Sequence, residues 1–174
     1  MTTPDPDGTQ CALFADMTLD ERQQVLELVE HETYSAREVI IREGLSTQIL
    51  WIIVRGRCEV VKLLKDKSEK ELAGLRPGSV FGEMSFFHPA PHSASVRALT
   101  DVEVMRLSRE RFDQLCESSP PAALKITESM VGVIAQRLRC MDDWMCDLIE
   151  QPDVVSHQEE WQEFRAKLYA DWEF

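Results

Sequence analysis

The stretch FGEMSFFHPAPHSASVRA, residues 81–98, gathers the residue types in this chain that suit the binding of a small polar molecule. It sets turn residues, small hydroxyls and one acid, Glu83, between two apolar runs. Gly82 has no side chain, so main-chain N–H groups can approach an anion closely there. A short helix beginning near Glu83 would point its first amides and its positive dipole end at the same anion. The stretch therefore predicts a loop that holds something small and polar.

The cationic side chains expected around such an anion are scarce. Between Glu83 and Arg97 the potentially cationic residues are His88 and His92. If residues 93–97 are extended, His92 and Arg97 lie an odd number of positions apart and point to opposite faces of the strand. Arg97 is therefore not expected to act on the same side of the segment as His92.

Two consecutive aromatic residues, Phe86 and Phe87, follow the glycine and the acid. They either fill part of a binding pocket or pack the short helix onto the rest of the domain. Packing is the commoner arrangement for large apolar side chains of this kind.

Composition bounds the class of protein. The 174 residues suit one domain with an appended helical piece, and 31 acidic against 19 basic residues give a net charge of −12. This charge argues against nucleic acid as the main partner, because Lys and Arg supply most affinity for phosphate backbones. No apolar run approaches the ~20 residues that span a bilayer, and the N-terminus does not resemble a signal peptide. We expect a cytoplasmic protein with neither a nucleic-acid nor a membrane partner.

Metal binding and catalysis have no support in the sequence. The five cysteines and four histidines show neither CxxC nor HExxH spacing, and no nucleophile–base pair is recognisable. The cysteines are expected to be buried, reduced thiols. We therefore predict a non-enzymatic protein without a metal or a cofactor.

The hydrophobic pattern predicts helix, then strands, then helices. Residues 12–34 fit one helix, with Thr18 and Glu21 as a capping box and one apolar face (Leu19, Val25, Leu26 and Val29). From residue 36, short β-branched runs alternate with glycine-containing turns. Five or more such strands indicate a mainly β sandwich or barrel. Residues 81–94 interrupt the strands with room for one helical turn and a proline loop.

Two further helices follow the strands. Ser108 is placed to cap a short helix, and Pro120-Pro121 begins a longer one. Apolar residues with one polar member form an a/d heptad seam along it: Leu124, Thr127, Val131, Ile134, Leu138, Met141, Met145 and Leu148. The seam favours a parallel homodimer, the alternative being a helix that lies on its own sandwich. Residues 151–174 are expected to form a linker and a terminal amphipathic helix, which packs back on the domain or docks a protein partner.

The runs GLSTQILWIIVRGRCEVV, LRPGSVFGEMSFF and PHSASVRALTDVEVMRLSRERFDQL closely resemble the cyclic-nucleotide-binding domain family, which includes catabolite-activator proteins, protein kinase A regulatory subunits and nucleotide-gated channels. The resemblance covers roughly residues 12–150. It implies a double-stranded β-helix, or jelly roll, over residues 12–118, a long dimerisation helix over 119–150, and the linker and terminal helix at 151–174. Residues 1–11 are expected to be a disordered lead-in.

By the same resemblance, residues 81–95 are a phosphate-binding cassette. It implies that Glu83 accepts a hydrogen bond from the ribose, and that Met141 or Asp142 of the long helix closes over the base. The ligand-binding residues that it implies are Phe81, Gly82, Glu83, Met84, Ser85, His92, Ser93, Ala94, Ser95, Met141 and Asp142.

The chain departs from the family at His92, where members that bind tightly usually have arginine. Arginine offers a permanent charge and a bidentate contact to phosphate, whereas histidine has a reference pKa of ~6.5. Losing the arginine contact would cost on the order of 1.5–3 kcal/mol, about 10- to 100-fold in affinity.

Three functional hypotheses follow. The first is a sensor domain that binds cAMP or cGMP and relays this through the long helix to a protein partner. The second keeps the fold without the ligand, as a dimeric interaction scaffold. The third, transcription regulation by direct DNA contact, is disfavoured because residues 151–174 are too few for a helix-turn-helix domain and are acidic.

Overall fold

The computed structural model describes residues 11–149. The predicted linker and terminal helix at 151–174, and residues 1–10 of the predicted lead-in, lie outside the described residues. The chain divides into two compact units, Met1–Gly132 and Val133–Phe174. The predicted fold class is confirmed for the described residues: two antiparallel sheets are followed by a long helix.

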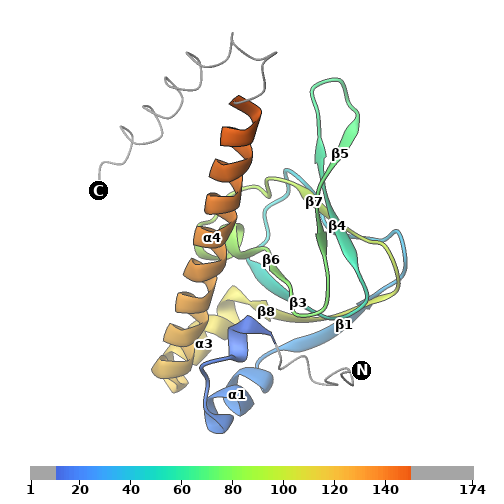
Figure 1. Cartoon of the computed structure of the whole chain (residues 1–174). Coiled ribbons are helices and arrows are strands. Elements are labelled where there is room, and N and C mark those ends of the chain that lie inside the picture. Colours follow the sequence, from blue (N-terminus) through green and yellow to red (C-terminus); the bar gives the residue numbers. More distant parts are fainter. Residues whose placement is uncertain (1–10, 150–174) are drawn as a thin grey trace, which may run out of the picture. The chain divides into compact units, whose positions relative to one another are not determined.

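Each sheet has four strands, and each is built from segments distant in sequence (Figure 1). One sheet has the order β1-β8-β3-β6 and the other β2-β7-β4-β5. The strands are β1 (Glu30–Tyr34), β2 (Val39–Ile41), β3 (Ile49–Arg55), β4 (Cys58–Leu63), β5 (Glu69–Leu75), β6 (Val80–Phe81), β7 (Ser95–Ala98) and β8 (Val102–Ser108). Because β7 lies between β2 and β4, the cassette that precedes β7 emerges beside the ends of both neighbours.

The helices are η1 (Ala12–Phe14, a 3-10 turn), α1 (Leu19–Leu26), α2 (Glu83–Phe87), α3 (Arg109–Ser118) and α4 (Pro120–Ile149). The predicted capping box is present at α1, where Thr18 Oγ1 accepts from the Glu21 amide and Glu21 Oε2 accepts from the Thr18 amide. Ser108 caps α3 as expected. None of the described helices combines the length and apolar character that a bilayer crossing requires.

The core between the sheets comes from the inward positions of β-branched and aromatic strand residues. Trp51 and Ile53 of β3 meet Ile41, Val96 and other side chains of the facing sheet. Full burial of such side chains contributes about 1.5–3 kcal/mol each, so this core positions the loops at its rim. The opposite face of β3 buries Leu50 and Ile52.

The prediction of one helix over residues 12–34 is wrong at both ends. The helix proper occupies Leu19–Leu26, and Glu30–Tyr34 instead pairs with β8 as strand β1. Tertiary pairing with a strand far along the chain overrides the local helical pattern. Leu19, expected on the apolar face, is 82% exposed because it stands at the first helical position, outside the packed stripe.

Two other expectations also need correction. Cys11, placed in the disordered lead-in, is buried, and its thiol donates to the Gly78 carbonyl oxygen at 3.1 Å. Burial raises the pKa of this thiol and, to about 11, that of Cys58. The other three cysteines (Cys116, Cys140 and Cys146) are exposed rather than buried.

Candidate functional site

The cassette begins where β6 ends, and Gly82 fixes its first turn. Gly82 has φ +85°, and a Cβ at this position would come within 2.6 Å of the Ile49 carbonyl oxygen and 2.7 Å of Trp51 Cε3. Glycine is thus required both by the left-handed backbone and by the close approach of β3. As the N-cap of α2, Gly82 provides no side-chain hydrogen bond to the first turn.

Predicted ligand residues at the start of the cassette are divided between the core and the surface. Phe81 is buried and stacks on Trp51 with ring centroids 5.6 Å apart, so it supports the cassette from the core. Glu83 and Ser85 are buried on α2, whereas the Met84 side chain is 61% exposed. The helix therefore turns an acid and a hydroxyl inward, together with Phe86.

The two phenylalanines pack the cassette helix onto the domain, which was the expected commoner arrangement. Phe86 is fully buried, and its ring centroid lies 5.4 Å from that of Phe112 on α3. Phe87 lies edge-on to both rings, at 5.0 Å from Phe86 and 5.8 Å from Phe112. The aromatic cluster anchors α2 to α3 rather than filling a ligand pocket.

His92 is buried, and both of its ring nitrogens have partners. Nε2 lies 2.6 Å from Thr47 Oγ1, and Nδ1 lies 3.1 Å from Ser85 Oγ. The main chain of His92 is also fixed, because its N–H donates to the Leu45 carbonyl and its own carbonyl accepts from Gly44. Burial lowers the pKa of the imidazole, so the ring is neutral near pH 7. Position 92 therefore locks the cassette to the loop that follows β2.

The far side of His92 borders a cavity of about 310 Å³ between the sheets. Thr47, Tyr34 and Trp51 contribute to its wall. Burial, reinforced by Glu32, raises the pKa of Tyr34 to about 12, so the phenol stays neutral. The His92 ring thus separates the cassette helix from this cavity.

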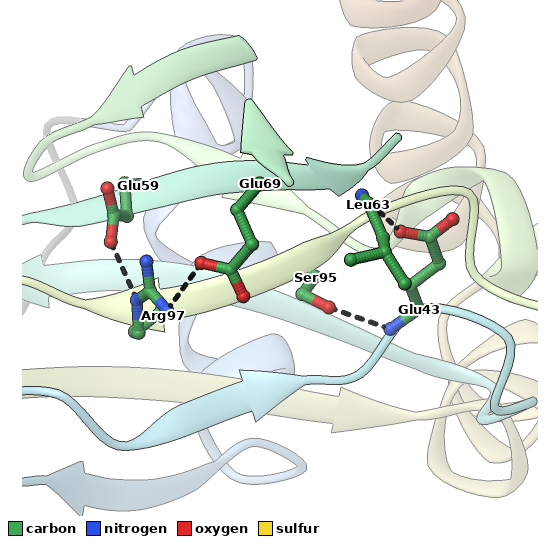
Figure 2. Close-up of polar contacts among 6 residues, drawn as sticks. All are labelled: Glu43, Glu59, Leu63, Glu69, Ser95 and Arg97. Carbon is green, nitrogen blue, oxygen red and sulfur yellow. Dashed lines mark hydrogen bonds and ion pairs between the residues drawn. The ribbon is translucent and has the colours of Figure 1, made fainter. Parts of the chain in front are cut away.

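The end of the cassette is tied to both flanking strands. Ser95 Oγ accepts a hydrogen bond from the Glu43 main-chain N–H at 3.0 Å (Figure 2). The Lys62 ammonium donates to the Ser93 carbonyl oxygen. Ser93 is exposed and Ala94 half-buried. The ligand-binding roles predicted for Ser93, Ala94 and Ser95 stay predictions.

Arg97 does not contribute to the cassette, in agreement with the sequence argument. Its guanidinium pairs with Glu59 at 2.7 Å and with Glu69 at 3.0 Å, on the outward side of β7 (Figure 2). Met141 and Asp142 lie on α4 in the unit that begins at Val133, and both are exposed. Their predicted place over the ligand stays a prediction. No cluster of three or more metal-ligating side chains occurs within the described residues.

Sequence reasoning missed Thr47 and Lys62, which contact the cassette from the loop between β2 and β3 and from β4, respectively. Their contacts depend on β2 and β4 flanking β7, and that order is set by tertiary pairing. If the register of the β7–β4 pair had been known, it would have predicted that Lys62 lies beside the cassette.

The described residues thus form a jelly roll that is interrupted by a glycine-started helix, a buried acid and small hydroxyls. The family model for the cyclic nucleotide-binding domain matches residues 31–119. The chain belongs to this family.

Relatives and solved structures agree with this assignment. The CRP-like cAMP-activated global transcriptional regulator of Mycobacterium tuberculosis is 29% identical over 110 residues, covering 63% of this chain and 47% of the relative. Thermus thermophilus catabolite activator protein matches with a TM-score of 0.70 and 28% identity, covering 79% of this chain and 62% of that structure. The regulatory domain of Toxoplasma gondii protein kinase A in complex with cAMP matches with a TM-score of 0.56 and 26% identity, covering 61% and 40% of the two chains. This chain spans about half the length of the mycobacterial relative that it matches.

Proposed function

We propose that this chain is a regulatory domain that binds a cyclic nucleotide, cAMP or cGMP, at residues 81–95 and passes the signal through α4 to a protein partner. The observation that carries the proposal is the start of the cassette. Gly82 holds a left-handed turn that a side chain would block, and the buried acid Glu83 follows it directly.

Affinity is expected to be low, because His92 is neutral and both of its nitrogens are engaged. The test is calorimetric titration with cAMP and cGMP of the parent chain and of His92→Arg, with 5′-AMP as the non-cyclic control. We expect the arginine variant to bind about 10- to 100-fold more tightly, the value of a charge-assisted bidentate contact. Absence of heat and of any shift in melting temperature at millimolar ligand in both chains would refute nucleotide binding.

The hydrogen bonds of His92 also favour a second candidate, a scaffold that no longer binds nucleotide. Thr47 and Ser85 satisfy the ring without any ligand. Nucleotide binding by His92→Arg but not by the parent chain would establish this candidate and reject the first.

Both candidates include a homodimer formed through the α4 seam. Seam residues Leu124 and Val131 are 57% and 62% exposed, while the neighbouring Ile126 and Met130 are buried in the β-roll unit. The helix thus has a separate apolar stripe besides the one that packs on its own domain, which is typical of a partner helix. Val131→Glu should give a monomer in analytical ultracentrifugation, whereas Glu128→Gln, off the seam, should leave the dimer intact. A monomeric parent chain would refute the dimer.

A further inference from the structure

An ion pair joins the two strands on either side of the cassette end. Lys62, on β4, places its Nζ 2.6 Å from Glu43 Oε1, just after β2. Since β7 lies between β2 and β4, the pair crosses the point where the cassette enters the sheet. The pair touches the cassette twice: Lys62 donates to the Ser93 carbonyl, and the Glu43 main chain donates to Ser95 Oγ.

The Glu43 carboxylate is bound by the kinds of donors that would also bind an external anion. One oxygen receives the Lys62 ammonium. The other accepts from the Leu63 main-chain N–H at 3.0 Å, which is the contact that Figure 2 shows. These contacts, Lys62 first, hold the pKa of Glu43 below its ordinary value. An ammonium and a main-chain amide are donors that also suit a phosphate oxygen.

Two basic side chains of the cassette and its following strand are not available to a phosphate. Arg97 is engaged by Glu59 and Glu69, and His92 is buried with a lowered pKa. Lys62, in contrast, places its ammonium in a hydrogen bond to the Ser93 carbonyl oxygen, next to His92 in the cassette. Its side chain is 39% exposed, so it can turn without disrupting the core.

We propose that Lys62 supplies the positive charge for the phosphate of the ligand, and that Glu43 is a resident anion that Lys62 leaves when ligand binds. The inference rests on the proposed function and adds the residues that set affinity. Under this proposal, the two residues of one ion pair have opposite effects on ligand affinity. Removing the Glu43 charge frees Lys62 and strengthens binding, whereas removing the Lys62 charge weakens it.

The test compares Glu43→Gln, Lys62→Met and the control Lys65→Gln by calorimetric titration with cAMP and cGMP, in the parent chain and in the His92→Arg background. The amide introduced by Glu43→Gln keeps an acceptor for the Leu63 N–H, and Lys65 lies in the exposed β4–β5 turn. We expect about tenfold tighter binding for Glu43→Gln, about tenfold weaker binding for Lys62→Met, and no change for the control, in line with one charge at short range near a protein surface. Glu43→Gln combined with Lys62→Met should bind as weakly as Lys62→Met.

Two outcomes overturn the inference while leaving nucleotide binding in place. Weaker binding by both single variants would mean that the pair only braces the cassette, and unchanged binding by Lys62→Met would mean that its charge does not reach the ligand. Urea denaturation of each variant separates loss of folding from loss of binding. Absence of binding by every chain, including Glu43→Gln in the His92→Arg background, overturns both this inference and the proposed function.

Discussion

The two halves of the cassette are fixed by different forces. The first half, Gly82–Phe87, is held by main-chain geometry and apolar packing: a glycine pressed against β3 and an aromatic cluster against α3. The second half, His92–Ser95, is held by hydrogen bonds from side chains and loops of the neighbouring strands. Because a packed half tolerates little change and a hydrogen-bonded half can exchange partners, ligand chemistry can vary in the second half while the fold is kept.

The largest loss of stability is expected at Phe86, in the packed first half of the cassette. Phe86→Ala removes a fully buried ring from the contact between α2 and α3, and should lower the free energy of unfolding by about 3–5 kcal/mol. Met84→Ala, on the exposed side of the same helix, should change it by less than about 0.5 kcal/mol. Urea denaturation of both variants measures the difference. Similar small losses in the two variants would show that packing does not hold the first half.

The next effect is expected at Gly82. Gly82→Ala combines left-handed strain with a Cβ forced against main-chain and ring atoms, and should cost about 2–4 kcal/mol. Gly44→Ala is a matched control, because Gly44 also has positive φ, +81°, but nothing lies within 4 Å of its added Cβ. It should cost about 1 kcal/mol from strain alone. Equal losses of stability in the two variants would mean that β3 moves away from the Cβ added at position 82.

This division also explains what could be predicted from the sequence. The glycine, the acid and the aromatic pair act locally, so their types and order predicted the helical turn and its packing. The fixing of His92 depends on Thr47, 45 positions away, and that of Ser93 on Lys62, 31 positions away. Those contacts depend on strand order and register, which local periodicity does not determine. The same limitation hid β1, whose pairing with β8 overrides a helical pattern.

Loss of a single hydrogen bond in the second half of the cassette should lower the free energy of unfolding by a smaller amount. Thr47→Val removes the 2.6 Å contact to His92 Nε2 and leaves a buried nitrogen without a partner, at a cost of about 1–3 kcal/mol. Ser46→Ala removes the neighbouring hydroxyl, whose bond to the Ala90 carbonyl is exposed, and should cost under about 0.5 kcal/mol. Thermal or urea unfolding checks both. A neutral Thr47→Val would show that His92 is held by its main chain.

Stability should also depend on pH through His92. Its pKa is lowered in the folded chain by burial, so the unfolded chain takes up the proton first as pH falls. The stability that neutral His92 contributes is therefore fully present above the ordinary pKa of ~6.5 and is lost as pH falls through it toward the lower folded value. The difference in unfolding free energy between the parent and His92→Gln, measured from pH 8 to 5, isolates this residue. A difference that grows on acidification would contradict the buried, neutral ring.

The smallest change in stability is expected at the ion pairs of Arg97. These pairs can be compared with the Glu43–Lys62 pair, which lies beside the same strand, β7. Glu69 is 52% exposed, so Glu69→Gln removes a solvent-screened contact and should change stability by less than about 0.5 kcal/mol. Arg97 also retains Glu59, so its side chain has no reason to turn toward the cassette. Nucleotide affinity should therefore remain that of the parent, although the same type of substitution at Glu43 is expected to raise it. Calorimetry on Glu43→Gln and Glu69→Gln together compares two carboxylates that both bind cations beside β7. If both variants gained affinity equally, general reduction of the negative charge would explain the gain, and the position of Lys62 at the cassette would not.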